Sequence, residues 1–204
     1  MTKKRSLGRP QRKRLPLEQR RKLVLEAAVK MMGERQGNEV TVVGIARELG
    51  WSVPAVTRCF RYRSDIINAL LDFAEESLLK LYGEVRARYP EDGRAFAREL
   101  FIVFHKFTEL NPGFVQVLTG RAFGVDEPEL MKRLLSLHDR WERWFREALK
   151  LGILNEQLPV DYDATARAAV LMQVLNGLWT RYAIETRHHR LSRIYPAVEA
   201  LMKP

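Results

Sequence analysis

Apolar residues recur at helical spacing along nearly the whole chain of 204 residues. In the first segment Leu23, Ala27 and Met31 form one stripe, and the apolar residues that follow each of them form a second stripe beside it. No segment shows the strict alternation of apolar and polar residues that a half-buried strand requires. The pattern therefore predicts an all-α protein of about nine helices.

Capping and breaking residues divide this pattern into separate helices. Asn111-Pro112-Gly113 ends one of them, because proline and glycine interrupt a regular helix. Ser64 is expected to cap the long fourth helix, whose two apolar stripes indicate that it packs on both sides and joins two parts of the molecule. Asp161 or Asp163 is expected to cap the long apolar helix near the C-terminus. The predicted helices span about residues 17–34, 42–49, 53–60, 65–86, 94–110, 114–123, 127–151, 164–186 and 194–202.

Positive charge is concentrated at the N-terminus. The formal net charge is +10, and residues 1–22 hold ten basic side chains against one acidic residue, Glu18, which leaves a net charge of +1 for the rest. A polyanion is the natural partner of such an arm. Nucleic acid fits better than a membrane, because the arm lacks the bulky apolar residues of a membrane-binding helix. Gly8-Arg9-Pro10 also resembles the core of an AT-hook, a segment that binds the minor groove of A·T-rich DNA.

Composition and motifs indicate a globular protein without catalytic machinery. The chain is 46% hydrophobic and 29% charged, with no apolar run of the roughly 20 residues that span a bilayer. Cys59 is the single cysteine, which excludes an internal disulfide and favours a cytoplasmic location, and His188 and His189 have no third ligand at metal spacing. No nucleophile elbow, zinc-binding His-Glu-x-x-His or phosphate-binding glycine loop occurs. We therefore expect no enzyme, no metal and no cofactor.

Residues 41–64 carry the pattern that is most specific to a function. Thr41 is expected to cap a short helix that ends at Gly50, and a tight turn leads from Gly50 into a second short helix with Pro54 in its first turn. Two short helices joined in this way form a helix-turn-helix, which places its second helix in the major groove of double-stranded DNA. A helical hairpin in an ordinary core is the alternative, and the adjacent basic arm favours DNA.

The expected DNA contacts lie on the second short helix, beside it and in the arm. Arg58 suits a guanine edge, Thr57 suits a base or a phosphate, and small apolar groups suit thymine methyl groups. The residues that follow, with the backbone N–H groups starting the next helix, are expected to hold phosphates. The full set comprises Arg9, Arg12, Lys13, Arg14, Thr41, Ser52, Val53, Ala55, Thr57, Arg58, Arg61, Tyr62 and Arg63. The predicted organisation is a basic arm (1–16), a DNA-binding head (17–64) and a helical body (65–204).

The same segment resembles the DNA-binding head of the TetR family of transcriptional regulators. The signature positions of that pattern are occupied by Thr41, Ile45, Ala46, Gly50, Ser52, Val56 and Phe60. Thr57 stands where tyrosine is usual and Cys59 where histidine is usual, and Pro54 is uncommon at its position. The usual tyrosine and histidine touch the DNA backbone. The resemblance implies a homodimer whose two heads read successive major grooves and whose C-terminal helices pair the subunits.

The apolar helix expected at about 164–186 is the candidate for the pairing surface. Large apolar residues cluster on it, and Gly177 allows two backbones to approach closely. A two-fold interface places this patch against its own copy. The residues expected there are Leu171, Val174, Leu175, Leu178 and Trp179.

Three segments outside the head resemble the nucleoid occlusion factors, a group within the TetR family whose members bind chromosomal sites and block the division protein FtsZ. These segments are residues 73–79, 111–123 and 173–182. The resemblance implies a nucleoid-associated protein with a filled body, which binds FtsZ through a surface that includes Glu75 and Glu76. The alternative is a ligand-responsive repressor, whose body holds a small-molecule effector in an apolar pocket. The sequence leaves these two functions open.

Overall fold

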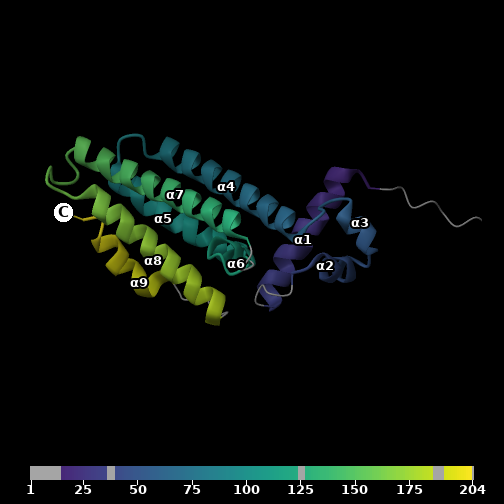
Figure 1. Cartoon of the computed structure of the whole chain (residues 1–204). Coiled ribbons are helices and arrows are strands. Elements are labelled where there is room, and N and C mark those ends of the chain that lie inside the picture. Colours follow the sequence, from purple (N-terminus) through teal and green to yellow (C-terminus); the bar gives the residue numbers. More distant parts are fainter. Residues whose placement is uncertain (1–14, 36–39, 124–126, 186–190, 204) are drawn as a thin grey trace, which may run out of the picture.

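The computed structural model describes residues 15–35, 40–123, 127–185 and 191–203, and within these ranges it contains nine helices and no strand (Figure 1). A small head at one end continues into a longer helical body, so the predicted all-α architecture is confirmed. The helices are α1 (Leu17–Arg35), α2 (Val42–Leu49), α3 (Val53–Thr57), α4 (Arg63–Arg88), α5 (Gly93–Leu110), α6 (Phe114–Leu118), α7 (Pro128–Leu154), α8 (Ala164–Glu185) and α9 (Leu191–Ala200).

The turn between α2 and α3 has the geometry that its residues predict. Thr41 Oγ1 accepts a hydrogen bond from the backbone N–H of Gly44 at 3.0 Å, so Thr41 caps α2. Gly50 ends α2 with a φ of 63°, a left-handed conformation that residues with a Cβ rarely adopt. Pro54 lies in the first turn of α3, whereas the hydroxyl of Ser52 makes no capping hydrogen bond. Local chemistry therefore fixes the turn of the helix-turn-helix.

Two short helices end earlier than predicted. α3 stops at Thr57, because the chain turns there and carries Phe60 into the core, where its side chain is buried. α6 stops at Leu118, and the chain then turns at Gly120, whose φ of 72° is left-handed. In both places the demands of tertiary packing end the helix before its apolar pattern does.

α4 joins the head to the body. The carboxylate of Asp65 accepts a hydrogen bond from the N–H of Tyr62 at 2.9 Å, so the helix begins at Arg63, and the prediction that Ser64 caps it is wrong. The helix packs against α1 in the head and against α5, α6 and α7 in the body. Its two apolar stripes therefore bury against both parts of the molecule, as predicted.

Aromatic side chains fill the centre of the body, between α5, α7 and α8. The ring of Phe104 packs edge-on against those of Trp141 and Phe145, with centroid distances of 6.1 and 5.8 Å. Trp141 meets Trp179 of α8 edge-on at 6.1 Å. Asp163 caps α8, because its carboxylate accepts the N–H of Ala166 at 2.9 Å. The helix α6 packs on α8 at the end of this core nearest the head (Figure 1). The C-terminal end of α9, where Val198 is buried, leads to a contact with the start of α5, because Arg94 donates to the carbonyl oxygen of Met202.

The start of α6 lies directly against α1. A Cβ atom at Gly113 would stand 2.0 Å from the carbonyl oxygen of Val29, so only glycine fits between the two backbones. Asn111-Pro112-Gly113 ends α5 as predicted, and its last residue also allows the head to dock on the body. This contact and the shared helix α4 hold the two parts together.

Candidate nucleic-acid interface

The residues predicted to read DNA bases lie on the solvent-facing side of α3. Ser52, Val53, Thr57 and Arg58 are exposed, Ala55 is half-buried, and the intervening Val56 is buried in the head. Thr41 is exposed at the start of α2. A short helix that buries one side and exposes hydroxyl, methyl and guanidinium groups on the other can enter a major groove and meet base edges.

Arg58 has the most donors on this face. Its Nε–H donates to the carbonyl oxygen of Pro54 at 3.0 Å, which holds the side chain along its own helix. The bond uses one of the five N–H donors of the guanidinium group. The two terminal nitrogens make no other hydrogen bond within the described ranges of the chain, and a guanine edge offers two acceptors to such a pair.

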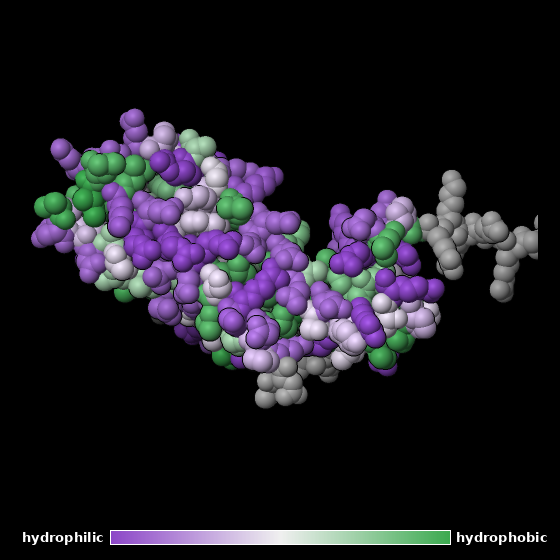
Figure 2. All heavy atoms as spheres, turned by 45° about the horizontal axis from the view of Figure 1, so that its top comes forward, coloured by the Kyte–Doolittle hydropathy of each residue, from purple (hydrophilic) through white to green (hydrophobic). Residues whose placement is uncertain are grey.

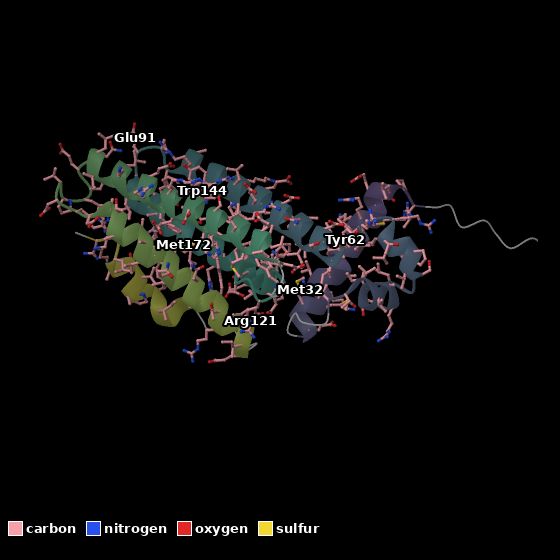
Figure 3. The ribbon with its side chains drawn as sticks, viewed as in Figure 1. Met32, Tyr62, Glu91, Arg121, Trp144 and Met172 are labelled. Atoms are coloured by element: carbon pink, nitrogen blue, oxygen red, sulfur yellow. The ribbon has the colours of Figure 1, made fainter. Side chains whose placement is uncertain are left out.

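The basic residues after α3 have different surroundings. The guanidinium of Arg61 lies 5.2 Å from the ring centroid of Tyr62, and both side chains are exposed. Figure 3 shows Tyr62 where α4 begins. Arg63 instead turns inward, where it donates to the carbonyl oxygens of Val40 and Ala122 and to the carboxylate of Glu127. Arg61 and Tyr62 are thus placed to meet a phosphate, whereas three donors of Arg63 are already occupied.

Arg21 supports α3 in a way that the sequence pattern missed. Its Nη1 donates to the carbonyl oxygen of Cys59 at 2.7 Å, and its guanidinium lies 4.1 Å from the ring centroid of Phe60. Arg21 counts toward the charge of the N-terminal segment, but its position on α1 is what directs it at the end of α3. The position of Arg9, Arg12, Lys13 and Arg14 in the arm lies outside the described residues, as does that of His188 and His189.

The helix α8 buries part of the predicted dimer surface inside the chain itself. Leu171, Leu175 and Trp179 are at most 1% exposed, so another subunit cannot cover them further. Val174 and Leu178 are half-buried, and Val170, one turn before Val174, is 43% exposed. A stripe of Val170, Val174 and Leu178 therefore remains on the surface of α8.

An apolar groove lies where the head meets the body. It has a volume of about 750 Å³ and is lined by α1, α4 and the segment from Leu110 to Phe114. Phe73 and Leu110, which line it, are 48% and 81% exposed, and the ring of Phe73 stacks on Phe114 at 5.3 Å. The predicted partner residue Glu75 is engaged elsewhere, in ion pairs with Arg133 and Arg140, while Glu76 is exposed.

Other surface features offer less chemistry. Figure 2 shows a largely hydrophilic face with hydrophobic residues at the end of the body away from the head, where Leu154 and Val160 are 77% and 92% exposed. Among the residues that the structure describes, no three His, Cys, Asp or Glu side chains are grouped closely enough to hold a metal ion. No helix in those same ranges is long and apolar enough to cross a membrane.

Comparison with known proteins identifies the family. No family model matches the chain. The nucleoid occlusion factor SlmA of Marinobacter nauticus is 31% identical over 163 residues, which cover 80% of this chain and 83% of the relative. SlmA of Photorhabdus laumondii is 26% identical over 179 residues, which cover 87% and 89% of the two chains.

The solved structures agree with the sequence relatives. A TetR transcription regulator from Haloarcula marismortui has a TM-score of 0.75 at 18% identity, covering 91% of this chain and 97% of its own. The regulator PfmR from Thermus thermophilus has a TM-score of 0.71 at 22% identity, covering 88% and 96%. FadR from Bacillus subtilis, solved with stearoyl-CoA, has a TM-score of 0.69 at 14% identity and covers 89% and 96%. In sequence and in fold, the chain belongs to the TetR family of regulators, in the group of the nucleoid occlusion factor SlmA.

Proposed function

We propose that the protein is a homodimer that binds specific chromosomal DNA sites and, when bound, blocks the polymerisation of FtsZ. The observation that carries the DNA-binding part is the exposed side of α3, which presents Thr57 and Arg58 beside the exposed pair Arg61 and Tyr62. Base edges would meet α3, and phosphates would meet Arg61, Tyr62 and the hydroxyl of Thr41. The protein would accordingly be associated with the nucleoid.

Dimerisation supplies the second half of the DNA site. We assign it to the face of α8 that carries Val170, Val174 and Leu178, since these apolar side chains are accessible in the single chain. A Cβ atom added at Gly177 would meet nothing within 4 Å, so the backbone of a second α8 has room to approach there. Two such helices facing each other across a two-fold axis would bury this stripe.

The groove beside Phe73 is the surface that best suits the partner protein. Its floor is apolar, and it lies between α1 of the head and the joining helix α4, so an FtsZ segment seated there would touch both the head and the body. The SlmA relatives are nucleoid occlusion factors by name, which supports a partner in cell division. We place the contact at this groove rather than around Glu75, because the carboxylate of Glu75 is committed to two arginines.

Two linked experiments test the proposal. Selection of bound fragments from genomic DNA should return a repeated two-fold sequence at sites scattered around the chromosome. Light scattering by FtsZ polymers should then fall when the protein and its selected site are added together. Phe73→Ala should remove this effect while DNA affinity stays unchanged, whereas Leu79→Ala should retain it, because Leu79 is equally exposed on α4 but does not line the groove. Unaltered polymers with bound wild-type protein would exclude the role in division.

A ligand-responsive repressor is the second candidate, and one observation favours it. Trp141 Nε1, Trp179 Nε1 and Gln116 Oε1 are buried without a hydrogen-bond partner among the described residues. Buried polar atoms are seldom left unpaired, and a small molecule with polar atoms would pair with them. The related folds SmeT and FadR were solved with triclosan and stearoyl-CoA. A small molecule that releases the protein from its DNA site would support this function.

A further inference from the structure

Arg63 connects the head and the body through one planar group. Its Nε–H donates to the carbonyl oxygen of Val40 in the head at 2.9 Å. Its Nη1 donates to the carboxylate of Glu127, just before α7, at 2.9 Å, and its Nη2 donates to the carbonyl oxygen of Ala122, just after α6. Arg63 is also the first residue of α4, so these contacts lie where the head turns into the body.

Partial burial and a planar shape let the guanidinium group of Arg63 restrict the positions of its partners. The side chains of Arg63 and Glu127 are only 25% and 20% exposed, and a partly buried ion pair is screened less than one on the surface. A guanidinium group holds its donors in a fixed plane, so it fixes the relative positions of the three acceptors that it contacts. A lysine at this position would present one nitrogen on a flexible stem and could not hold all three.

The contacts of Arg63 and the contact between α1 and α6 attach different parts of the head to the body. α1 rests on α6 at Gly113, whereas Arg63 holds the segment just before α2. With the first attachment alone, the head could tilt about α4. With both, the direction in which α3 projects from the body is set.

We infer that Arg63 is a positioning residue, which orients the head on the body and so sets the half-site spacing that the dimer accepts. This inference rests on the proposed DNA-binding dimer. Half-sites read by paired helix-turn-helix heads lie about one helical turn apart, roughly 34–36 Å, so a fixed head selects one spacing and a loose head accepts several. A phosphate-binding arginine would act differently, because its loss weakens every site alike.

The test compares Arg63→Lys and Glu127→Gln with wild type and with the control Arg61→Ala. Each full-length protein is titrated with the selected DNA site and with versions whose half-site spacing is changed by one and two base pairs. Wild type should prefer one spacing by about tenfold or more, since a misplaced head loses its base contacts. Arg63→Lys and Glu127→Gln should reduce this preference to within about threefold, whereas Arg61→Ala should weaken all sites and keep the preference.

A second measurement does not depend on DNA. Spin labels at position 18 on α1 and position 129 on α7, both exposed, report the distance between head and body in a Cys59→Ala background. The distance distribution should be broader in Arg63→Lys and Glu127→Gln than in the labelled parent. If both variants kept the spacing preference of wild type and showed the distance distribution of the labelled parent, the inference would be overturned. Broader distances in a protein that selects no DNA site would instead overturn the proposed function and leave the positioning role supported.

Discussion

Arg58 is the side chain on which base discrimination depends in the proposed complex. Its bond to Pro54 holds the guanidinium against α3 and leaves two terminal nitrogens for a guanine edge. Arg58→Ala should therefore cost about 1–3 kcal/mol of binding free energy at the selected site and relax preference at one base position. Titrations against single-base variants of the site measure both effects. If affinity falls equally for all variants, Arg58 contacts only phosphate.

His138 links the stability of the body to pH. Burial lowers the pKa of its imidazole from the usual 6.5, although its Nε2 lies 3.0 Å from the carbonyl oxygen of Leu118. The unfolded chain binds this proton more readily, so the free energy of unfolding should rise with pH up to about 6.5 and decline below it. Urea unfolding at pH 5 and pH 7.5 should show a larger difference for wild type than for His138→Gln. Equal differences would assign the pH dependence to other groups.

In the proposed homodimer, the helix α8 is the element that decides whether two heads act together. Leu178→Glu should yield a monomer and abolish tight binding to the two-fold site, because the two-fold axis would place the new charge against its own copy in an apolar interface. Leu79→Glu on α4 is the matched control, since it adds the same charge at an exposed leucine away from α8 and should remain dimeric. Sedimentation of the two variants measures the result. A dimeric Leu178→Glu variant would move the interface to another helix, most directly to α7.

Elements whose ends depend on neighbouring residues could be predicted from the sequence, and those that depend on distant contacts could not. Thr41 and Gly50 define α2 through bonds within a few residues, so capping chemistry alone locates it. The end of α3 depends on Phe60 entering a core that forms from several helices. The division of α8 into buried and accessible stripes likewise depends on the packing of α7, because every side of this helix carries apolar residues.

The same distinction separates the residues of the candidate interface. The exposed side of α3 follows from helical spacing, and Thr57 and Arg58, which the sequence predicts to contact DNA, lie on that side. Arg21 and Arg63 meet acceptors that lie 38 and 64 positions away in the chain. Charge counting could place these arginines in a basic region, but it could not show that Arg21 supports α3 within the head or that Arg63 joins the head to the body.

At the scale of the whole molecule, the N-terminal arm should supply binding that is independent of sequence. Deleting residues 1–15 removes seven positive charges, so affinity should fall. The slope of the logarithm of the binding constant against the logarithm of salt concentration should become less negative by about 0.9 for each phosphate that the arm no longer neutralises. Titrations between low and moderate salt on selected and random DNA measure this slope. Replacing the seven charged residues by glutamine, with the length unchanged, separates charge from chain length. An unchanged slope in both variants would exclude the arm from the interface.

A single hydrophobic core runs without a break from the head through α4 into the body. The head is consequently not an independent domain that could be exchanged between relatives without other changes. An exchanged head must arrive with an α4 whose other side suits the new body, and with a segment before α2 whose backbone carbonyl reaches Arg63. In the proposed complex, a substitution deep in the body, far from any base pair, would therefore also alter how the head meets DNA.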